Sequence, residues 1–404
     1  GIRLLRQAAR RGRRLCRGAF RPDCHLTLPI HCIFFPPFQR LEVSLLYGRA
    51  VFYVSNRFLS SLFPKGWKGG VSFLTESLWS KTTDMPAYPP LRGELRADVA
   101  VIGGGMAGIL IAYFLAKAGL HPVVLEAERI GSGQTKNTTA KITSQHGLLY
   151  ARLVEQFGEE LAQQYAHANQ KALEHYRTLI AELDIDCAFT QCPAYLYSTL
   201  EEEPLVREAQ AARRLGIEAN FTRRTELPFS VRAAVRFDGQ ARFHPLHFLR
   251  AVASHLEIYE HTPVQSVEEH RLLTPHGVVM AETIVFACHY PFLNMPGYYF
   301  MRMHQERSYV LALENTAKME GMYLGIDENG LSFRPDENVL LLGGGSHRTG
   351  ENAAGGRYAR LRRLAQRYWP ESREIAAWSA QDCMTLDGVP YIGPFSSSTP
   401  HWYV

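Results

Sequence analysis

The hydrophobic pattern of residues 98–126 predicts two strands with a helix between them. Residues 98–102 form an apolar run, residues 106–119 carry apolar side chains at helical spacing, and residues 122–125 form a second apolar run. A strand, a helix and another strand in close succession are typical of a βαβ unit with parallel strands. The pattern therefore predicts such a unit here, and the rest of the chain is organised around it.

Beyond this unit the pattern alternates between helical and strand periods. Residues 258–290 alternate in short runs, which indicates a small antiparallel ribbon that leads into a buried strand. The apolar stripe of the first long helix indicates core packing. The predicted helices cover residues 159–183, 201–214, 244–256 and 355–368, and the predicted strands cover 187–190, 194–198, 283–288, 301–314 and 339–345.

The turn between the first strand and its helix has the spacing G-x-G-x-x-G. Gly103 allows a tight turn, Gly105 lets backbone approach a pyrophosphate, and Gly108 lets the helix lie close to the sheet. The helix N-terminus offers free N–H groups to phosphates. Glu126 follows Gly105 by 21 residues and can accept the ribose hydroxyls. With strand, helix, second strand and acid all in place, we expect a bound dinucleotide rather than a bare glycine turn.

Residues 1–75 differ in composition from the rest. Residues 1–70 hold 13 Lys and Arg but only two acids, a net charge of +11 against +5 for the whole chain, so the remainder carries −6. The acidic remainder has no nucleic-acid footprint. A targeting arm or a nucleic-acid or membrane arm is one interpretation of the basic segment. We favour a disordered or non-native extension, because Pro29, Pro36 and Pro37 interrupt its apolar stretch.

The length and composition of the chain limit its number of domains and its cellular compartment. The 404 residues leave room for two or three structural units, and the seven cysteines are sparse and lack a C-x-x-C pair. Reduced thiols in the cytoplasm are the expected state. No apolar run reaches the length of a membrane span. Motifs of hydrolases and kinases are missing from the sequence.

The segment after Glu126 extends the motif with a second glycine loop, 131–135. The pattern from Asp98 to Thr135 resembles the FAD-dependent oxidoreductases of the D-amino-acid oxidase, glycine oxidase and sarcosine oxidase superfamily, over roughly residues 76–404. The stretches RIGSGQTKNTTAKITSQHG, ARFHPLHFL, RMHQERSYVLALE, LLLGGGSHRTG and AAWSAQDCMTLDGVPYIG are similar to the branch that often carries a C-terminal Rieske [2Fe–2S] domain.

The resemblance implies an α/β fold, in which a doubly wound, Rossmann-like FAD-binding domain holds an inserted α+β substrate domain built on an antiparallel sheet. The basic extension would be 1–75. The FAD-binding parts would be 76–185, 241–292 and the start of the last segment, 385–404, and the substrate parts 186–240 and 293–384.

The same resemblance assigns positions to the cofactor. The glycine turn, with Met106 and Ala107, would contact the pyrophosphate, and Glu126 the adenosine ribose. Arg129 would flank that ribose or be a solvated surface arginine. The remaining implied cofactor positions are Gly131, Ser132, Gly133 and Thr135 near the pyrophosphate, Thr139, Ala140 and Lys141 near the isoalloxazine, Val264 near the adenine, and Ala287 and Gly393.

Candidate catalytic residues come from the predicted substrate sheet. Arg307 and Tyr309 alternate on one strand and would share a face, where Arg307 could grip a carboxylate or be a structural arginine. His347, after the Gly343–Gly345 turn, is a further candidate or part of a polar hairpin. His244 and His247 at a helix start indicate a cap or core histidine rather than a metal site.

A Rieske centre needs C-x-H and a later C-x-x-H, and neither occurs in this sequence. The resemblance also implies a further strand and helix where the chain stops at Val404. We therefore expect a fragment, with any [2Fe–2S] centre in a missing C-terminal domain.

The expected function is FAD-dependent oxidation of a C–N bond in an amino acid or amine, by hydride transfer to the flavin, with oxygen or an iron–sulfur centre as electron acceptor. No nucleic-acid partner and no membrane span are expected. A nicotinamide-dependent dehydrogenase and a non-catalytic dinucleotide-binding protein remain as alternatives, since the glycine motif alone does not choose among them.

Overall fold

The computed structural model describes residues 44–46, 49–51, 76–351 and 355–404. The chain divides into two units, residues 1–72 and 73–404. In the first unit, strands β1 (Ser44–Leu46) and β2 (Arg49–Val51) form an antiparallel pair. The rest of the predicted extension, 1–75, lies outside the described residues, so its expected disorder or foreign origin stays a prediction. In the described ranges no helix is long and apolar enough to cross a membrane.

The first large sheet of the second unit contains the predicted βαβ unit. Strands β3 (Gly93–Ile102) and β4 (Pro122–Leu125) are parallel neighbours, and helix α3 (Met106–Lys117) connects them. Val99 and Val101 belong to one core cluster and Ala100 and Ile102 to another. Because successive side chains of a strand point to opposite faces, both faces of this sheet are covered, as in a doubly wound fold.

The same sheet has the strand order β11-β4-β3-β14-β13-β12, with β21 beside β14 and β20 beside β21. Strands β11, β4, β3, β14 and β21 pair in parallel, and the others add antiparallel pairs, which include the predicted ribbon. The added strands are β11 (Glu257–Tyr259), β12 (Ser266–Glu268), β13 (Arg271–Leu273), β14 (Gly277–Phe286), β20 (Pro394–Ser396) and β21 (Thr399–Tyr403).

The second large sheet has the order β19-β15-β18-β17-β16-β7-β9-β8 and is antiparallel except for the pair β16–β7. Its longest strands are the hydrogen-bonded neighbours β15 (Met303–Glu314) and β19 (Arg373–Thr385). The others are β7 (Ala194–Ser198), β8 (Ala219–Thr222), β9 (Ala233–Phe237), β16 (Met322–Gly325), β17 (Ser332–Asp336) and β18 (Val339–Arg348).

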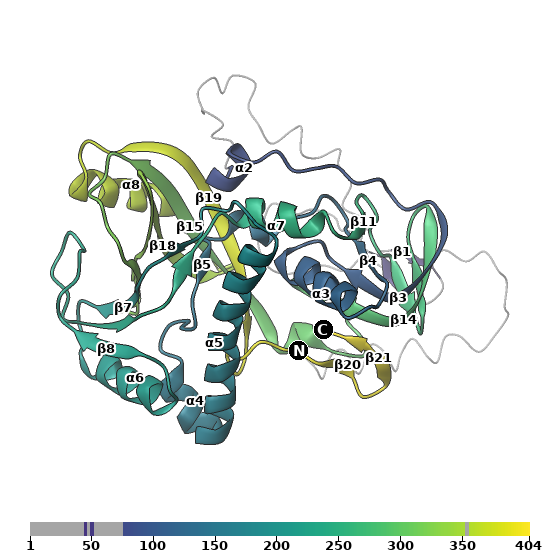
Figure 1. Ribbon diagram of the computed structural model, residues 1–404, viewed down its shortest axis with the longest axis horizontal. Helices are drawn as coiled ribbons and strands as arrows, with labels where there is room; N and C mark the ends of the chain where they lie inside the picture. The colour runs from purple at the N-terminus through teal and green to yellow at the C-terminus, as the bar shows by residue number, and fades with distance from the viewer. Residues whose placement is uncertain (1–43, 47–48, 52–75, 352–354) are drawn as a thin grey trace. The chain divides into compact units, whose positions relative to one another are not determined.

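Two helices pack on this second sheet, and a third lies between the elements of the first sheet and those of the second. Helix α6 (Glu203–Arg214) packs on β8 and β9, and helix α8 (Arg357–Tyr368) packs on β15 and β18. Helix α5 (Glu159–Glu182) runs between the group that contains β3, β14 and α3 and the group that contains β7, β8 and α6 (Figure 1). The smaller elements are helices α2 (Leu78–Lys81), α4 (Tyr150–Phe157) and α7 (Pro245–Ala253), 3-10 turns η2 (Gln134–Asn137) and η3 (Tyr299–Met301), and a three-stranded sheet of β5 (Lys141–Ile142), β10 (Ala241–Arg242) and β6 (Thr190–Gln191).

Helix α4 shows why some elements escaped the sequence pattern. The buried Glu208 of α6 accepts hydrogen bonds from the backbone N–H groups of Leu149, Tyr150 and Ala151, at 2.9, 2.8 and 3.0 Å. A carboxylate from a distant helix thus satisfies the first N–H groups of α4 and favours the positive end of its dipole. No local signal predicts that cap.

The proposed boundaries at 185, 240, 292 and 384 stay predictions. Each large sheet does draw on separated stretches of chain, since β11 and β14 return to β3 and β4 after β7, β8 and β9 have entered the second sheet.

Candidate active site

The backbone of the glycine turn after β3 is packed so closely that side chains would not fit at two of its glycines. Gly103 has φ +113°, and a Cβ there would lie 2.6 Å from the carbonyl oxygen of Ala287. A Cβ on Gly108 would lie 1.9 Å from the carbonyl oxygen of Gly103. Ala287 follows β14 and donates a backbone hydrogen bond to Ile102 at 2.9 Å, which holds the two strand ends together. Glycine is therefore required here by sterics as well as by φ.

The N-terminus of α3 begins directly after this turn. Gly105 is its N-cap, and among the described residues the one group near a Cβ built there is the Thr135 hydroxyl oxygen, at 3.4 Å. The backbone N–H of Met106 donates to that hydroxyl at 2.9 Å, and Ala107 is exposed. The first N–H groups of this helix have no intrahelical acceptors, and its dipole favours an anion. The turn therefore has the shape and charge to hold a pyrophosphate.

Glu126 is fixed beside the same turn. One carboxylate oxygen accepts from the backbone N–H of Gly104 at 2.6 Å, and the other accepts from the N–H of Glu128 at 2.9 Å. Each carboxylate oxygen can accept a second hydrogen bond. Glu126 is thus oriented at the end of β4, where a ribose hydroxyl could reach it.

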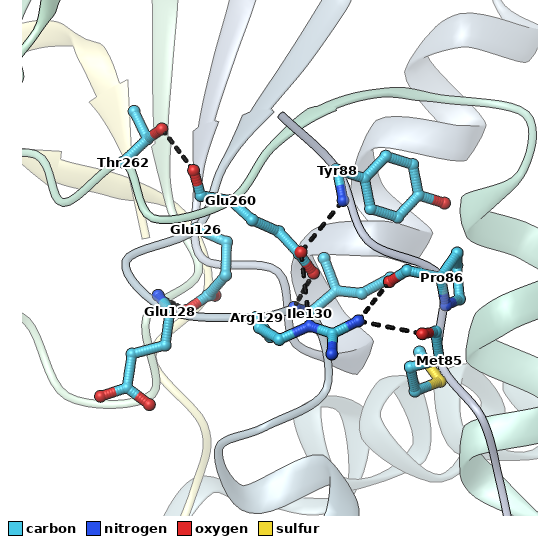
Figure 2. A network of polar contacts seen from close by, with 9 residues as sticks. All are labelled: Met85, Pro86, Tyr88, Glu126, Glu128, Arg129, Ile130, Glu260 and Thr262. Carbon is cyan, nitrogen blue, oxygen red and sulfur yellow. Dashed lines mark hydrogen bonds and ion pairs between the residues drawn. The ribbon is translucent and has the colours of Figure 1, made fainter. Parts of the chain in front are cut away.

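Arg129 belongs to a network that ties the lead-in segment to this edge of the sheet. Its Nη2 donates to the carbonyl oxygens of Met85 and Pro86 at 2.9 and 2.7 Å, and its Nε lies 3.5 Å from a carboxylate oxygen of Glu260 (Figure 2). The buried Glu260 also accepts from the N–H groups of Ile130 and Tyr88, at 2.8 and 3.1 Å. Arg129 therefore has structural partners, a role that sequence reasoning missed because Glu260 lies far along the chain.

The second glycine loop lies against the first. The N–H of Gly131 donates to the carbonyl of Gly104 at 2.9 Å. Gly131 has φ +70°, and a Cβ there would lie 2.8 Å from Leu249. Ser132 and Gly133 continue the loop into η2. The second glycine loop is thus hydrogen-bonded to the first, next to the N-terminus of α3.

Lys141, in β5, extends toward the second sheet. Its Nζ donates to the carbonyl of Tyr323 at 3.0 Å and to the hydroxyl of Ser332 at 2.7 Å. Burial, with the nearby charge of Arg334, lowers the pKa of Lys141 to about 7. Its neighbour Ala140 is buried and has φ +56°.

A cavity of about 530 Å³ joins the two halves of this unit. It begins at the N-terminus of α3 and η2, passes β5 and α5, and reaches the paired strands β15 and β19. Its lining includes Met106, Gln134, Thr135, Thr139, Ala140, Lys141, His146, Asn169, Tyr176, Phe243, His289, Ser308, Ala380 and Asp382. Sites of this size, apolar with a few polar groups, are typical of small-molecule binding.

The predicted catalytic residues lie together, on the other face of β15. Arg307 pairs in register with His347, and Tyr309 stacks on the His347 ring with centroids 5.8 Å apart. Arg307 donates to Ser379 Oγ at 3.0 Å and to Gln381 Oε1 at 2.6 Å.

Tyr309 packs with the core cluster under α8, whereas Ser308, one position before it, lines the cavity. Successive side chains of a strand point to opposite faces, so Arg307 and Tyr309 face away from the cavity. The structure does not bring these three residues to the cavity, and their catalytic roles stay predictions.

The remaining predicted positions are spread around the first sheet. Val264 follows β11 and packs beside the core cluster that contains Leu272 and Trp402. Gly393 precedes β20, and its N–H donates to the carbonyl of Val404 at 3.0 Å. His244 is the N-cap of α7 and accepts from the N–H of His247 at 3.3 Å, as expected for a cap.

Asp382 and His289 are cavity residues that sequence reasoning missed. Asp382 lies opposite Glu306 in the β15–β19 register, so their side chains share a face. Desolvation raises the pKa of Asp382, with a lowering effect from His289 and a raising effect from Glu306. The alternation of Ala380 and Asp382 was a signal, but strand β19 itself was not predicted.

A doubly covered parallel sheet, a glycine turn at a helix N-terminus and an adjoining cavity are typical of a dinucleotide-binding protein. The chain belongs to the FAD dependent oxidoreductase family, whose sequence profile matches residues 98–404. It is thus an FAD-dependent oxidoreductase, and the family prediction is confirmed.

Two curated relatives extend this placement. The protein named "Putative Rieske 2Fe-2S iron-sulfur protein YhfW" from Bacillus subtilis (strain 168) is 35% identical over 340 residues, which cover 80% of this chain and 67% of that protein. Gamma-glutamylputrescine oxidoreductase from Escherichia coli (strain K12) is 25% identical over 217 residues, half of each chain. The likeness to the Rieske-associated branch is therefore confirmed.

Solved structures show the same fold. Glycine oxidase from Geobacillus kaustophilus superposes with a TM-score of 0.62 at 20% identity, over 77% of this chain and 88% of that one. L-proline dehydrogenase from P. horikoshii gives 0.61 at 17% identity, over 78% and 87%. The predicted fold class is confirmed by these neighbours.

Proposed function

We propose that the protein oxidises the C–N bond of an amine or amino acid. The observation that carries this proposal is the continuous cavity between the dinucleotide turn, at Met106 and Thr135, and the paired strands of the second sheet, at Ser308 and Asp382. A substrate there would lie between the redox cofactor and a separate recognition surface. Gamma-glutamylputrescine oxidoreductase, glycine oxidase and L-proline dehydrogenase, by their names, all act on compounds with an amine nitrogen.

FAD fits the residues that line the turn. Gly103 and Gly108 let the strand, turn and helix pack closely, Gly105 leaves space where a Cβ would stand, and the N–H groups of Met106 and Ala107 lie at the helix N-terminus. We propose that these groups hold the pyrophosphate and that Glu126 holds the ribose. We propose that the rest of the cofactor is bound by Arg129, Gly131, Ser132, Gly133, Thr135, Thr139, Ala140, Lys141, Val264, Ala287 and Gly393. When bound, FAD accepts the hydride that leaves the carbon beside the nitrogen.

The chain's own groups would prepare the substrate. Tyr176, Phe243 and Leu173 form an apolar wall that excludes water from the reacting carbon. Desolvation lowers the pKa of His146, which disfavours its positively charged form in the cavity. Removal of a hydride requires the neutral amine, so a group in the cavity must accept the ammonium proton.

The acceptor of the electrons is oxygen or an iron–sulfur centre. The second choice is supported by the Rieske name of the Bacillus subtilis relative, of which this chain spans 67%. Within the described ranges, no group of three or more His, Cys, Asp or Glu residues could hold a metal ion. A [2Fe–2S] centre would therefore be supplied by protein outside these ranges. We also propose a cytoplasmic setting, supported by the free thiols of Cys187, Cys192, Cys288 and Cys383.

Anaerobic reduction tests the proposed reaction. The purified, FAD-loaded protein would be mixed with a panel of amines and amino acids while flavin absorbance is followed. Bleaching by at least one class, faster than bleaching of free FAD, is the expected result. A protein that binds FAD but is bleached by neither class would overturn the proposed function. Bleaching by NADPH or NADH alone would assign a nicotinamide-linked reaction instead.

A further inference from the structure

The end of the cavity at the second sheet carries negative charge. Asp382 lines the cavity from β19, and Glu306 stands opposite it on the same face of β15. Two carboxylates this close disfavour each other's ionised forms, and a cation placed between or beside them removes that cost. Asp382 is an exposed residue of the cavity lining, so a ligand can reach its carboxylate. The surface therefore favours a cationic ligand group.

Two histidines stand near this end: His289 lines the cavity and its charge lowers the pKa of Asp382, and His304 Nε2 lies 3.4 Å from a Glu306 carboxylate oxygen. Among the described residues that line the cavity there is no arginine, and the one lysine is Lys141. Its Nζ is directed to the Tyr323 carbonyl and the Ser332 hydroxyl, neither of which lines the cavity. The lowered pKa of Lys141 further reduces its positive charge near neutral pH.

The arginine that the sequence suggested as a carboxylate grip is also turned away. Arg307 precedes Ser308 on β15, but its guanidinium bonds to Ser379 and Gln381, which alternate with Ala380 and Asp382 on β19. Because Ala380 and Asp382 line the cavity, Arg307 lies on the opposite face of the sheet. A substrate carboxylate in the cavity would meet Asp382 without this arginine to pair with.

We propose that the substrate is a cationic amine with no carboxylate on the carbon that bears the nitrogen, and that Asp382 binds its ammonium group. The inference rests on the proposed function and narrows it from amines and amino acids to amines. A charge-assisted hydrogen bond from ammonium to Asp382 stabilises the amine complex. An α-carboxylate in the same place is repelled by Asp382 and Glu306, and it would have to compete with Asp382 for His289.

Two compounds that cannot be oxidised test recognition separately from turnover. Tert-butylamine and 2-aminoisobutyric acid both lack a C–H beside the nitrogen, and they differ by a methyl group in place of the carboxylate. Binding of each to the FAD-loaded protein would be measured by isothermal titration calorimetry. We expect tert-butylamine to bind at least roughly tenfold more tightly, the effect of one hydrogen bond to a charged group. Equal binding, or tighter binding of 2-aminoisobutyric acid, would overturn the inference.

Variants at Asp382 assign the preference to this side chain. Asp382→Asn should weaken tert-butylamine binding by roughly ten- to hundredfold, whereas Asp382→Glu, which keeps the charge, should restore part of it. The matched control is Glu371→Gln, which removes the same charge at an exposed position in the turn before β19 and should bind as the wild type does. Unchanged binding by Asp382→Asn would contradict the assignment, and a melting midpoint for each variant would show that it is folded.

Turnover distinguishes failure of this inference from failure of the proposed function. Matched pairs such as phenethylamine and D- or L-phenylalanine would be compared by kcat/KM. Preference for the amine, lost in Asp382→Asn, supports the inference. Preference for the amino acid overturns the inference and leaves C–N oxidation standing. Reduction of FAD by neither class overturns the proposed function, while the binding comparison still decides the charge preference of the cavity.

Discussion

The glycine turn after β3 leads into the helix end that borders the cavity, and the paired strands β15 and β19 border it from the other side, but the residues of the two regions acquire their roles in different ways. At the turn, backbone contacts decide: a Cβ on Gly108 would meet the carbonyl of Gly103 at 1.9 Å. On the strands, the face decides: Ser308 meets the cavity while its neighbours Arg307 and Tyr309 do not. Local geometry can be deduced from local sequence, but the choice of face depends on what packs on each side.

The largest effect is expected from Gly108→Ala. The added methyl group would collide with the Gly103 carbonyl and force the strand, turn and helix apart, so we expect loss of bound FAD and a clear drop in melting midpoint. Flavin absorbance per mole of protein and a thermal scan measure both.

The control is Gly119→Ala, just beyond the other end of α3, where the Cβ meets open space but φ is +88°. Its backbone strain should cost about 1 kcal/mol without loss of FAD. Retention of FAD by Gly108→Ala would contradict the proposed role of the turn.

The next largest effect is expected on the cavity face of β15. Ser308→Leu would place apolar bulk in the cavity, so we expect kcat/KM for the best substrate to fall at least tenfold while FAD content and melting midpoint change little. Steady-state kinetics and a thermal scan measure this. An unchanged kcat/KM would show that substrate does not reach β15.

The opposite face should respond in the opposite way. Arg307→Met removes hydrogen bonds to Ser379 and Gln381, which should cost about 1–3 kcal/mol of stability. Activity per mole of bound FAD should stay within about twofold, since the guanidinium does not line the cavity. A large fall in kcat/KM without loss of stability would restore the catalytic role predicted for Arg307.

The smallest effect is a pH dependence from Lys141. Its folded-state pKa, about 7, lies below its ordinary value of 10.5, so unfolding takes up a proton between these two values. Wild-type stability relative to Lys141→Met should therefore decrease as pH falls from about 10 to 7 and level off below 7.

Melting midpoints of wild type and variant at several pH values test this. Lys171→Met, on the exposed side of α5, is the control and should show no such trend relative to wild type. A parallel pH profile for wild type and Lys141→Met would show that the pKa of Lys141 is not lowered in the folded protein.

Sequence reasoning succeeded where the signals are local. The predicted strand 122–125 matches β4, and the helices predicted at 106–119 and 159–183 match α3 and α5 within two residues at their ends. Each of these elements was predicted from its own run of apolar residues or from the glycine turn beside it, without reference to distant residues.

The missed features depend on contacts between distant residues. Arg129 is held by Glu260 and by the carbonyls of Met85 and Pro86, and α4 is capped by Glu208. The alternation of Arg307 and Tyr309 correctly put them on one face. Which face meets the cavity depends on α8, because this helix covers the face of β15 that carries Tyr309 and leaves the face with Ser308 to the cavity.

The most direct test of the central claim is the visible absorption spectrum of the purified chain after incubation with FAD and removal of free cofactor by gel filtration. The account predicts flavin bands that remain with the protein and are lost in Gly108→Ala. A protein that shows no flavin bands under these conditions, but retains NAD in the same experiment, would contradict the assignment of the glycine turn to FAD.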